Sequence, residues 1–81
     1  MDHESLVIVL SAGGAILGPE ELASLPGASV TWARFEREGS AACLAARVRH
    51  DDPLPDFRSR LRGWGASRGW SVTVAPCGAP R

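Results

Sequence analysis

The pattern of apolar and polar positions predicts four strands. Residues 6–10 form an unbroken apolar run rich in β-branched side chains, which is typical of a strand buried on both faces inside a sheet. Residues 29–38 and 41–50 flank a turn at 38–40, and this arrangement predicts a hairpin. Residues 70–75 are expected to form the last strand, because valines recur there at every second position.

Two helices are expected between these strands. Pro19 followed by two glutamates is typical of a helix start, and the predicted helix is short because Pro26-Gly27 ends it. A second helix should begin after Asp51-Asp52, with an aspartate as its cap and proline in its first turn. Its apolar residues recur at spacings of three, four and three, as expected for one buried helix face: Leu54, Phe57, Leu61 and Trp64.

The order of these elements predicts an α+β fold, the ferredoxin-like βαββαβ sandwich, as a single domain over residues 1–81 with a loose tail at 76–81. Its antiparallel sheet would have the order 4-1-3-2, with two helices on one face. Counting alternate positions places one apolar set under the helices: Leu6, Ile8, Leu10, Leu44, Ala46 and Val48. The opposite set is expected on the open face, with Arg47 at its margin: Val7, Val9, Cys43 and Ala45.

An apolar open face in a small domain indicates a homodimer or docking on a partner enzyme. The chain has no net charge, but all nine of its basic residues are arginines at or beyond position 34. Four of them form a basic patch on the second predicted helix: Arg58, Arg60, Arg62 and Arg68. This patch supports an alternative function, nucleic-acid binding, which is disfavoured because the two central strands lack the aromatic residues that stack on bases.

Catalytic chemistry is not indicated. The sequence contains no recognisable nucleophile–base pair, and its histidines and cysteines lack the spacing of a metal site. We therefore expect no enzyme activity, no metal and no cofactor. The absence of an export signal and of a long apolar segment favours a cytoplasmic protein with reduced thiols and no membrane span.

Three segments resemble ACT domains, a family of amino-acid-binding regulatory domains, and in particular the N-terminal ACT domain of bacterial phosphoserine phosphatases. The similar segments are residues 38–48, 55–67 and 71–74. The resemblance implies a non-catalytic regulatory module that can bind a small ligand such as an amino acid in the loop after the first strand. Ser11, Gly13 and Gly14 would line that loop, whose amides could receive an anion. The loop departs from the family pattern, because it lacks the Asp or Asn that would recognise an amino group.

Overall fold

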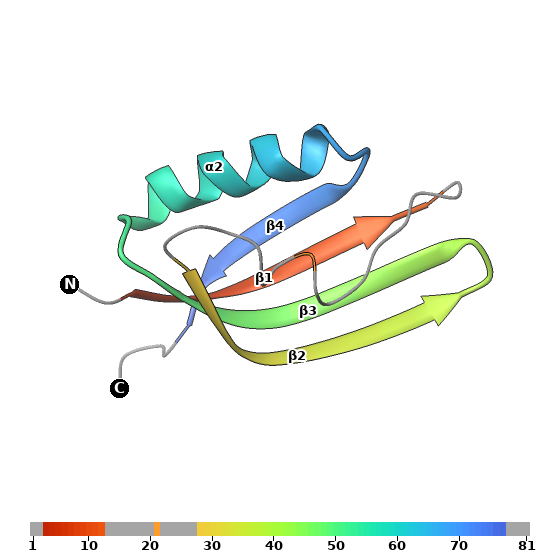
Figure 1. Ribbon diagram of the computed structural model, residues 1–81, viewed down its shortest axis with the longest axis horizontal. Coiled ribbons are helices and arrows are strands. Elements are labelled where there is room, and N and C mark those ends of the chain that lie inside the picture. Colours follow the sequence, from red (N-terminus) through yellow and green to blue (C-terminus); the bar gives the residue numbers. More distant parts are fainter. Residues whose placement is uncertain (1–2, 13–20, 22–27, 78–81) are drawn as a thin grey trace.

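The computed structural model describes residues 3–12, 21 and 28–77. Four strands form one antiparallel sheet, and one helix packs on one face of it (Figure 1). The elements are β1 (His3–Ser11), β2 (Ala28–Glu38), β3 (Ala41–His50), α2 (Leu54–Ala66) and β4 (Ser71–Pro76). A sheet with a helix packed on it is an α+β fold.

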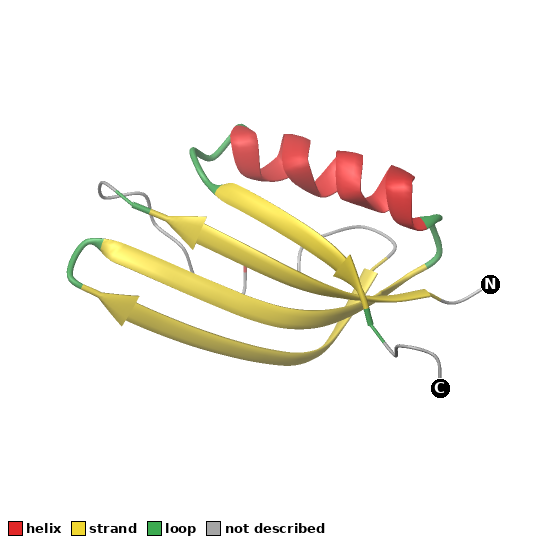
Figure 2. Ribbon diagram, turned by 180° about the vertical axis from the view of Figure 1, so that it is seen from behind, coloured by secondary structure: helices red, strands yellow, loops and turns green. Residues whose placement is uncertain are grey.

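The sheet has the order β2-β3-β1-β4, which places β1 between β3 and β4. The central position of β1 agrees with its apolar sequence, because an unbroken apolar run is typical of a strand with neighbours on both sides. Read from the β4 edge, this order is 4-1-3-2, so each strand has the neighbours that the sequence predicted. β2 and β4 are the two edge strands, and α2 runs beside β4 (Figures 1 and 2).

The predicted βαββαβ sandwich with two helices is wrong for the part of the chain that the structure describes, which contains α2 alone as a full helix. Most of the first predicted helix lies outside the described residues. Glu21 is the only described position in that segment, and it is helical. The architecture of the described residues is therefore a four-stranded sheet with one helix packed on it.

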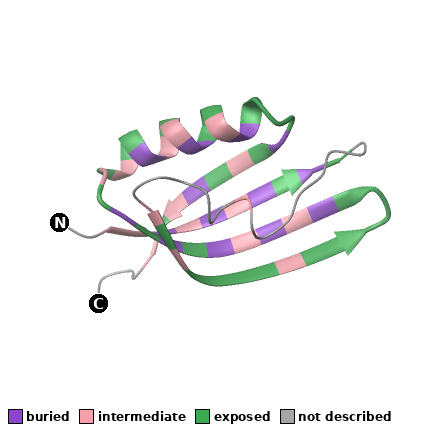
Figure 3. Ribbon diagram, in the orientation of Figure 1, coloured by how far each residue is buried: buried purple, intermediate pink, exposed green. Residues whose placement is uncertain are grey.

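The hydrophobic core lies between α2 and the sheet, and Figure 3 shows how burial alternates along β1 and β3. The core side of the sheet carries Val7, Val9, Ala42, Leu44, Ala46, Val48 and Val74, which form one buried cluster with Phe57 and Leu61 of the helix. The prediction for β3 is correct, but the prediction for β1 is inverted. Val7 and Val9 have no exposed surface and belong to the core, whereas Leu6 and Ile8 are half-buried on the other face.

Pairing between strands explains the inversion. Val7 lies opposite Ala46 and Val9 lies opposite Leu44, so these four side chains share one face. Residues directly opposite each other in an antiparallel pair point to the same side of the sheet. The predicted combination of Leu6, Ile8 and Leu10 with the even-numbered residues of β3 would need a register shifted by one residue.

The turn and the helix start are built from particular residues. Gly39 adopts a φ of 61°, a conformation that L side chains rarely take, and this makes the tight β2–β3 turn. The predicted aspartate cap of α2 is wrong, because Pro53 occupies the N-cap and no side chain bonds there. Asp52 instead forms an ion pair with Arg60, at 3.0 Å between Oδ2 and Nη2.

The predicted loose tail begins later than expected. Pro76 is the last residue of β4, and the N–H of Cys77 donates a hydrogen bond to the carbonyl of Glu4 at 3.0 Å. These two residues therefore extend the edge of the sheet. The rest of the predicted tail, residues 78–81, lies outside the described residues.

Candidate functional site: the open face of the sheet

The sheet face opposite α2, called the open face below, carries apolar side chains. The apolar residues on this face are Leu6, Ile8 and Leu10 of β1, Trp32 of β2, and Cys43 and Ala45 of β3. Leu10 is 49% exposed and Trp32 is 47% exposed, and these are the large exposed hydrophobic side chains of the described residues. Of the predicted interface residues, Cys43 and Ala45 lie on this face, and Val7 and Val9 do not.

The apolar centre of the open face has polar margins. On the β2 side, Arg34 and Glu36 form an exposed ion pair at 2.9 Å. Arg47 lies opposite both Trp32 and Leu6, at one end of the face. On the β4 side, Thr73 pairs with Ile8 and is exposed. An apolar centre surrounded by polar residues of both charges is the usual composition of a protein–protein interface.

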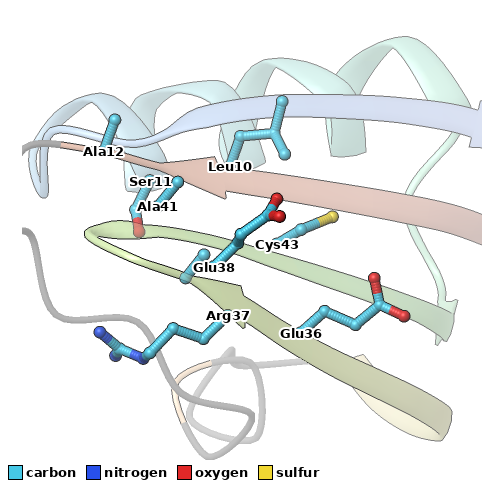
Figure 4. A pocket seen from close by; sticks show the side chains of 9 residues that line it. Leu10, Ser11, Ala12, Glu36, Arg37, Glu38, Ala41 and Cys43 are labelled. Atoms are coloured by element: carbon cyan, nitrogen blue, oxygen red, sulfur yellow. The ribbon is translucent and has the colours of Figure 1, made fainter.

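Two depressions lie at opposite ends of this surface. One, of about 540 Å³, is lined by Leu6, Thr31, Trp32 and Arg47. The other, of about 730 Å³, lies at the β2–β3 turn (Figure 4). Its lining includes Leu10, Glu36, Glu38, Ala41 and Cys43. Figure 4 shows Arg37 directed away from Glu38, so the charged groups nearest the apolar part of this second depression are carboxylates.

The predicted ligand loop offers little polar chemistry where it is described. Ser11 ends β1 and is only 4% exposed, and its Oγ has no hydrogen-bond partner among the residues that the structure describes. Ala12 follows it and carries no polar side chain. Gly13 and Gly14 lie outside the described residues. The hydroxyl of Ser11 is too deeply buried to meet a ligand without movement of its surroundings.

The predicted basic patch is not a continuous row of available cations. Arg58 donates from Nε and Nη2 to the carbonyl of Val74, at 3.3 and 3.2 Å. Arg60 is paired with Asp52, as described above. Arg62 is exposed on α2.

Arg68 lies at the end of α2 and is occupied by aromatic and acidic neighbours. Its guanidinium is 5.2 Å from the ring centroid of Trp64 and 5.9 Å from that of Trp70. Its Nε lies 3.7 Å from Oε1 of Glu21. Both tryptophans pack at the core margin, with their rings edge to face at 5.2 Å. Arg58 and Arg68 therefore connect the helix and its C-terminal end to neighbouring parts of the domain.

A buried serine–histidine pair was missed by sequence reasoning. Ser5 and His50 lie 45 residues apart in the chain, but β1 and β3 bring the Ser5 Oγ to 2.8 Å from the His50 Nε2. The His50 Nδ1 lies 2.9 Å from the carbonyl of Asp52. Because a carbonyl can only accept, Nδ1 carries the proton, and the Ser5 hydroxyl donates to Nε2.

The environment of His50 disfavours its charged form. Burial lowers the pKa of His50 below its usual value of 6.5, because the charged imidazolium would lose its hydration. The ring stacks on Phe57, with centroids 3.6 Å apart, and His3 lies on its other side at 5.6 Å. Ser5 is only 1% exposed. A substrate cannot reach this hydroxyl, so the pair holds β1, β3 and α2 together and is not placed for nucleophilic catalysis.

Other chemistry-bearing groups are scattered. Cys43 and Cys77 are free thiols. Among residues 3–12, 21 and 28–77, no three histidine, cysteine or acidic side chains are grouped as metal ligands. In the same residues, no helix is both long and apolar enough to cross a membrane.

Comparison with known proteins assigns no class to the chain. No family model, no curated protein and no solved structure matches it. The resemblance to ACT domains stays a prediction, and the function has to be argued from the surface of the molecule.

Proposed function

We propose that this chain is a non-catalytic interaction module that self-associates through the open face. The observation that carries the proposal is that Leu10 and Trp32, each about half exposed, lie on the same sheet face as half-buried apolar residues of β1 and β3. Single exposed apolar residues are common on protein surfaces, whereas a contiguous apolar patch marks an interaction site.

A merely hydrated face would have a different composition. In an antiparallel sheet with one wet face, strands alternate between apolar residues on the core side and polar residues on the other. The open face of β1 instead carries Leu6, Ile8 and Leu10, while the core side of the same strand includes Ser5 and Ser11. The bulkier apolar side chains of this strand are therefore on the side away from the helix.

The charges at the margin favour a second copy of the chain as the partner. The chain has no net charge, and the open face carries both arginine and glutamate. Two copies can therefore meet without an excess of like charge. Most soluble homo-oligomers have two-fold symmetry, in which the same patch is used by both copies.

Amino-acid binding and nucleic-acid binding are left out of this proposal. The Ser11 hydroxyl is buried, and the described part of the loop has no other polar side chain. For nucleic acid, Arg58 and Arg68 are engaged by Val74 and Trp64. Regulation of a partner enzyme is not needed to explain the surface.

Sedimentation velocity over micromolar to millimolar concentrations tests the proposal. The wild-type chain should form a dimer, and Leu10→Asp should shift it to a monomer because it places a charge among the apolar side chains of the open face. Ser59→Asp is the matched control, since it adds the same charge at an exposed position on α2. A wild-type chain that stays monomeric at every concentration would exclude self-association, and a Leu10→Asp dimer as stable as the wild-type one would exclude this face.

A further inference from the structure

The two ends of the open face differ in chemistry, and this difference suggests how two copies fit together. At one end, Trp32 is exposed beside Arg47, which lies directly opposite it on β3. At the other end, the depression of about 730 Å³ combines an apolar wall, formed by Leu10 and Cys43, with the carboxylate of Glu38. An exposed aromatic next to arginine is typical of interface anchor residues.

The depression can accept an aromatic side chain. Its volume lies within the range of about 300–1,000 Å³ that is usual for small-molecule pockets, so an indole ring fits. The ring would contact apolar atoms of Leu10, Ala41 and Cys43. A carboxylate at the margin can accept the indole N–H, which needs a hydrogen-bond partner when it is buried. The depression therefore has the volume and the lining chemistry to accept the Trp32 side chain.

The strand registers place Trp32 and the depression at equal distances from one midpoint along the strands. On the open face of β2, Trp32, Arg34, Glu36 and Glu38 follow one another towards the turn. Arg34 lies opposite Ala45, and Glu36 lies opposite Cys43. The midpoint between Arg34 and Glu36 is thus level with the midpoint between Ala45 and Cys43 on β3. It is also level with the midpoint between Ile8 and Leu10 on β1, because Ile8 pairs with Ala45 and Leu10 pairs with Cys43.

We propose that two copies pack open face to open face about a two-fold axis that lies between the sheets, perpendicular to the strands, at this midpoint. This arrangement rests on the proposed function. Such a rotation keeps each strand over its counterpart and reverses its direction. Trp32 of one copy then enters the depression of the second copy, while Ile8 faces Leu10 and Ala45 faces Cys43.

The same rotation brings opposite charges together. Arg34 of each copy faces Glu36 of the other, which gives two equivalent ion pairs at the margin of the interface. Within one chain these side chains already form an ion pair, but they are 69% and 63% exposed. An exposed pair contributes little to stability, so its exchange for a pair between copies costs little.

Charge reversal tests the orientation. Arg34→Glu and Glu36→Arg should each raise the dimer dissociation constant about tenfold, because each places like charges at two symmetric contacts. The double variant Arg34→Glu/Glu36→Arg should dimerise like the wild type. An equimolar mixture of the two single variants should form a heterodimer, since every contact in it joins opposite charges. Arg62→Glu on α2 is the control and should leave the dissociation constant unchanged.

The outcomes separate the orientation from the proposed function. If the wild type is a monomer, self-association itself is wrong. If the wild type is a dimer but the mixed single variants associate no better than either alone, the two-fold orientation is wrong. If charge reversal acts as expected while Leu10→Asp leaves the dimer intact, the copies pair along the outer edge of β2 and the face-to-face arrangement is overturned. Sedimentation velocity of each variant and of the mixture supplies all three readouts.

Discussion

Two glycines in α2 provide a sharp test of how the helix packs on the sheet. A Cβ added at Gly63 would meet no atom within 4 Å, whereas a Cβ added at Gly65 would overlap the Cγ2 methyl of Val72 and lie 3.4 Å from the carbonyl of Trp70. Both positions are inside α2, and alanine favours a helix over glycine by about 1 kcal/mol. The two Gly→Ala substitutions should therefore have opposite effects.

The magnitudes follow from these surroundings. Gly63→Ala should raise the free energy of unfolding by about 0.5–1 kcal/mol, since it gains helix propensity without a new contact. Gly65→Ala gains the same propensity but forces Val72 and the helix apart, and overpacking costs about 1–3 kcal/mol. The net result should be a loss of about 1 kcal/mol. Val72 cannot easily turn its methyl away, because a β-branched side chain has few allowed rotamers.

Guanidinium unfolding followed by tryptophan fluorescence measures both variants at concentrations where the chain is monomeric. In the Gly65→Ala background, Val72→Ala should cost less than it does alone, with a coupling energy of about 1–2 kcal/mol. If Gly65→Ala is as stable as the wild type, α2 does not approach β4 as closely at Gly65 as described. If Gly63→Ala destabilises the domain, the space around Gly63 is not open.

Three further predictions concern the core, its histidine and the edge strand. Val7→Asp should lower the free energy of unfolding by more than 3 kcal/mol because it buries a charge. Ile8→Asp, on the open face, should lower it much less. Similar losses for the two variants in urea unfolding would contradict the assignment of Val7 to the core and Ile8 to the open face. Because His50 has a lowered pKa in the fold, the unfolded chain takes up its proton first, so stability should be complete above 6.5 and fall as pH decreases below it. His50→Gln should flatten this slope, and an unchanged slope would refute the assignment. Arg58→Ala should cost about 1 kcal/mol by removing the donors to Val74, and faster amide exchange confined to β4 would show the local effect.

The sequence predicted an element correctly where its apolar residues recur with one clear spacing. The alternation along residues 41–50 correctly predicts β3 and its buried face, because every second residue from Ala42 to His50 is buried. The spacing of apolar residues in α2 is equally clear, and Phe57 and Leu61 are fully buried on the predicted side. In both elements the local pattern and the tertiary packing require the same orientation.

The orientation of β1 could not be predicted in this way. Its apolar run has no alternation, so either face could be the buried one. Including the flanking serines in the pattern would point to the wrong face, because Ser5 and Ser11 are polar but buried. What decides the orientation is the register against β3, including the hydrogen bond between Ser5 and His50. Contacts between residues 45 positions apart leave no signal in a local window.

The charged residues near α2 were misjudged for a related reason. One of Asp51 and Asp52 was expected to cap the helix, and Arg60 was expected to belong to a basic patch, but Asp52 and Arg60 pair with each other. Composition indicates how many charges a segment carries. It does not indicate which of them the fold pairs, and pairing determines whether a patch can bind an external anion.

Self-association and stability are linked in this domain, and the link yields a last prediction. If the open face joins two folded copies and the unfolded chains separate, each tenfold rise in protein concentration stabilises the dimer by about 1.4 kcal/mol, or half of that per chain. For a domain of this size the unfolding midpoint should rise by about 3–5 °C per tenfold increase.

Calorimetry of the wild type and of Leu10→Asp over the same concentrations measures this dependence. The wild-type midpoint should rise with concentration, and the midpoint of Leu10→Asp should stay constant, because a monomer unfolds without a change in the number of particles. Gly63→Ala should shift the midpoint upward equally at every concentration, since its position on α2 is remote from the open face. A midpoint of the wild type that does not depend on concentration, in the range where sedimentation detects a dimer, would mean that the copies remain associated after unfolding, and the folded open face would then not be the surface that joins them.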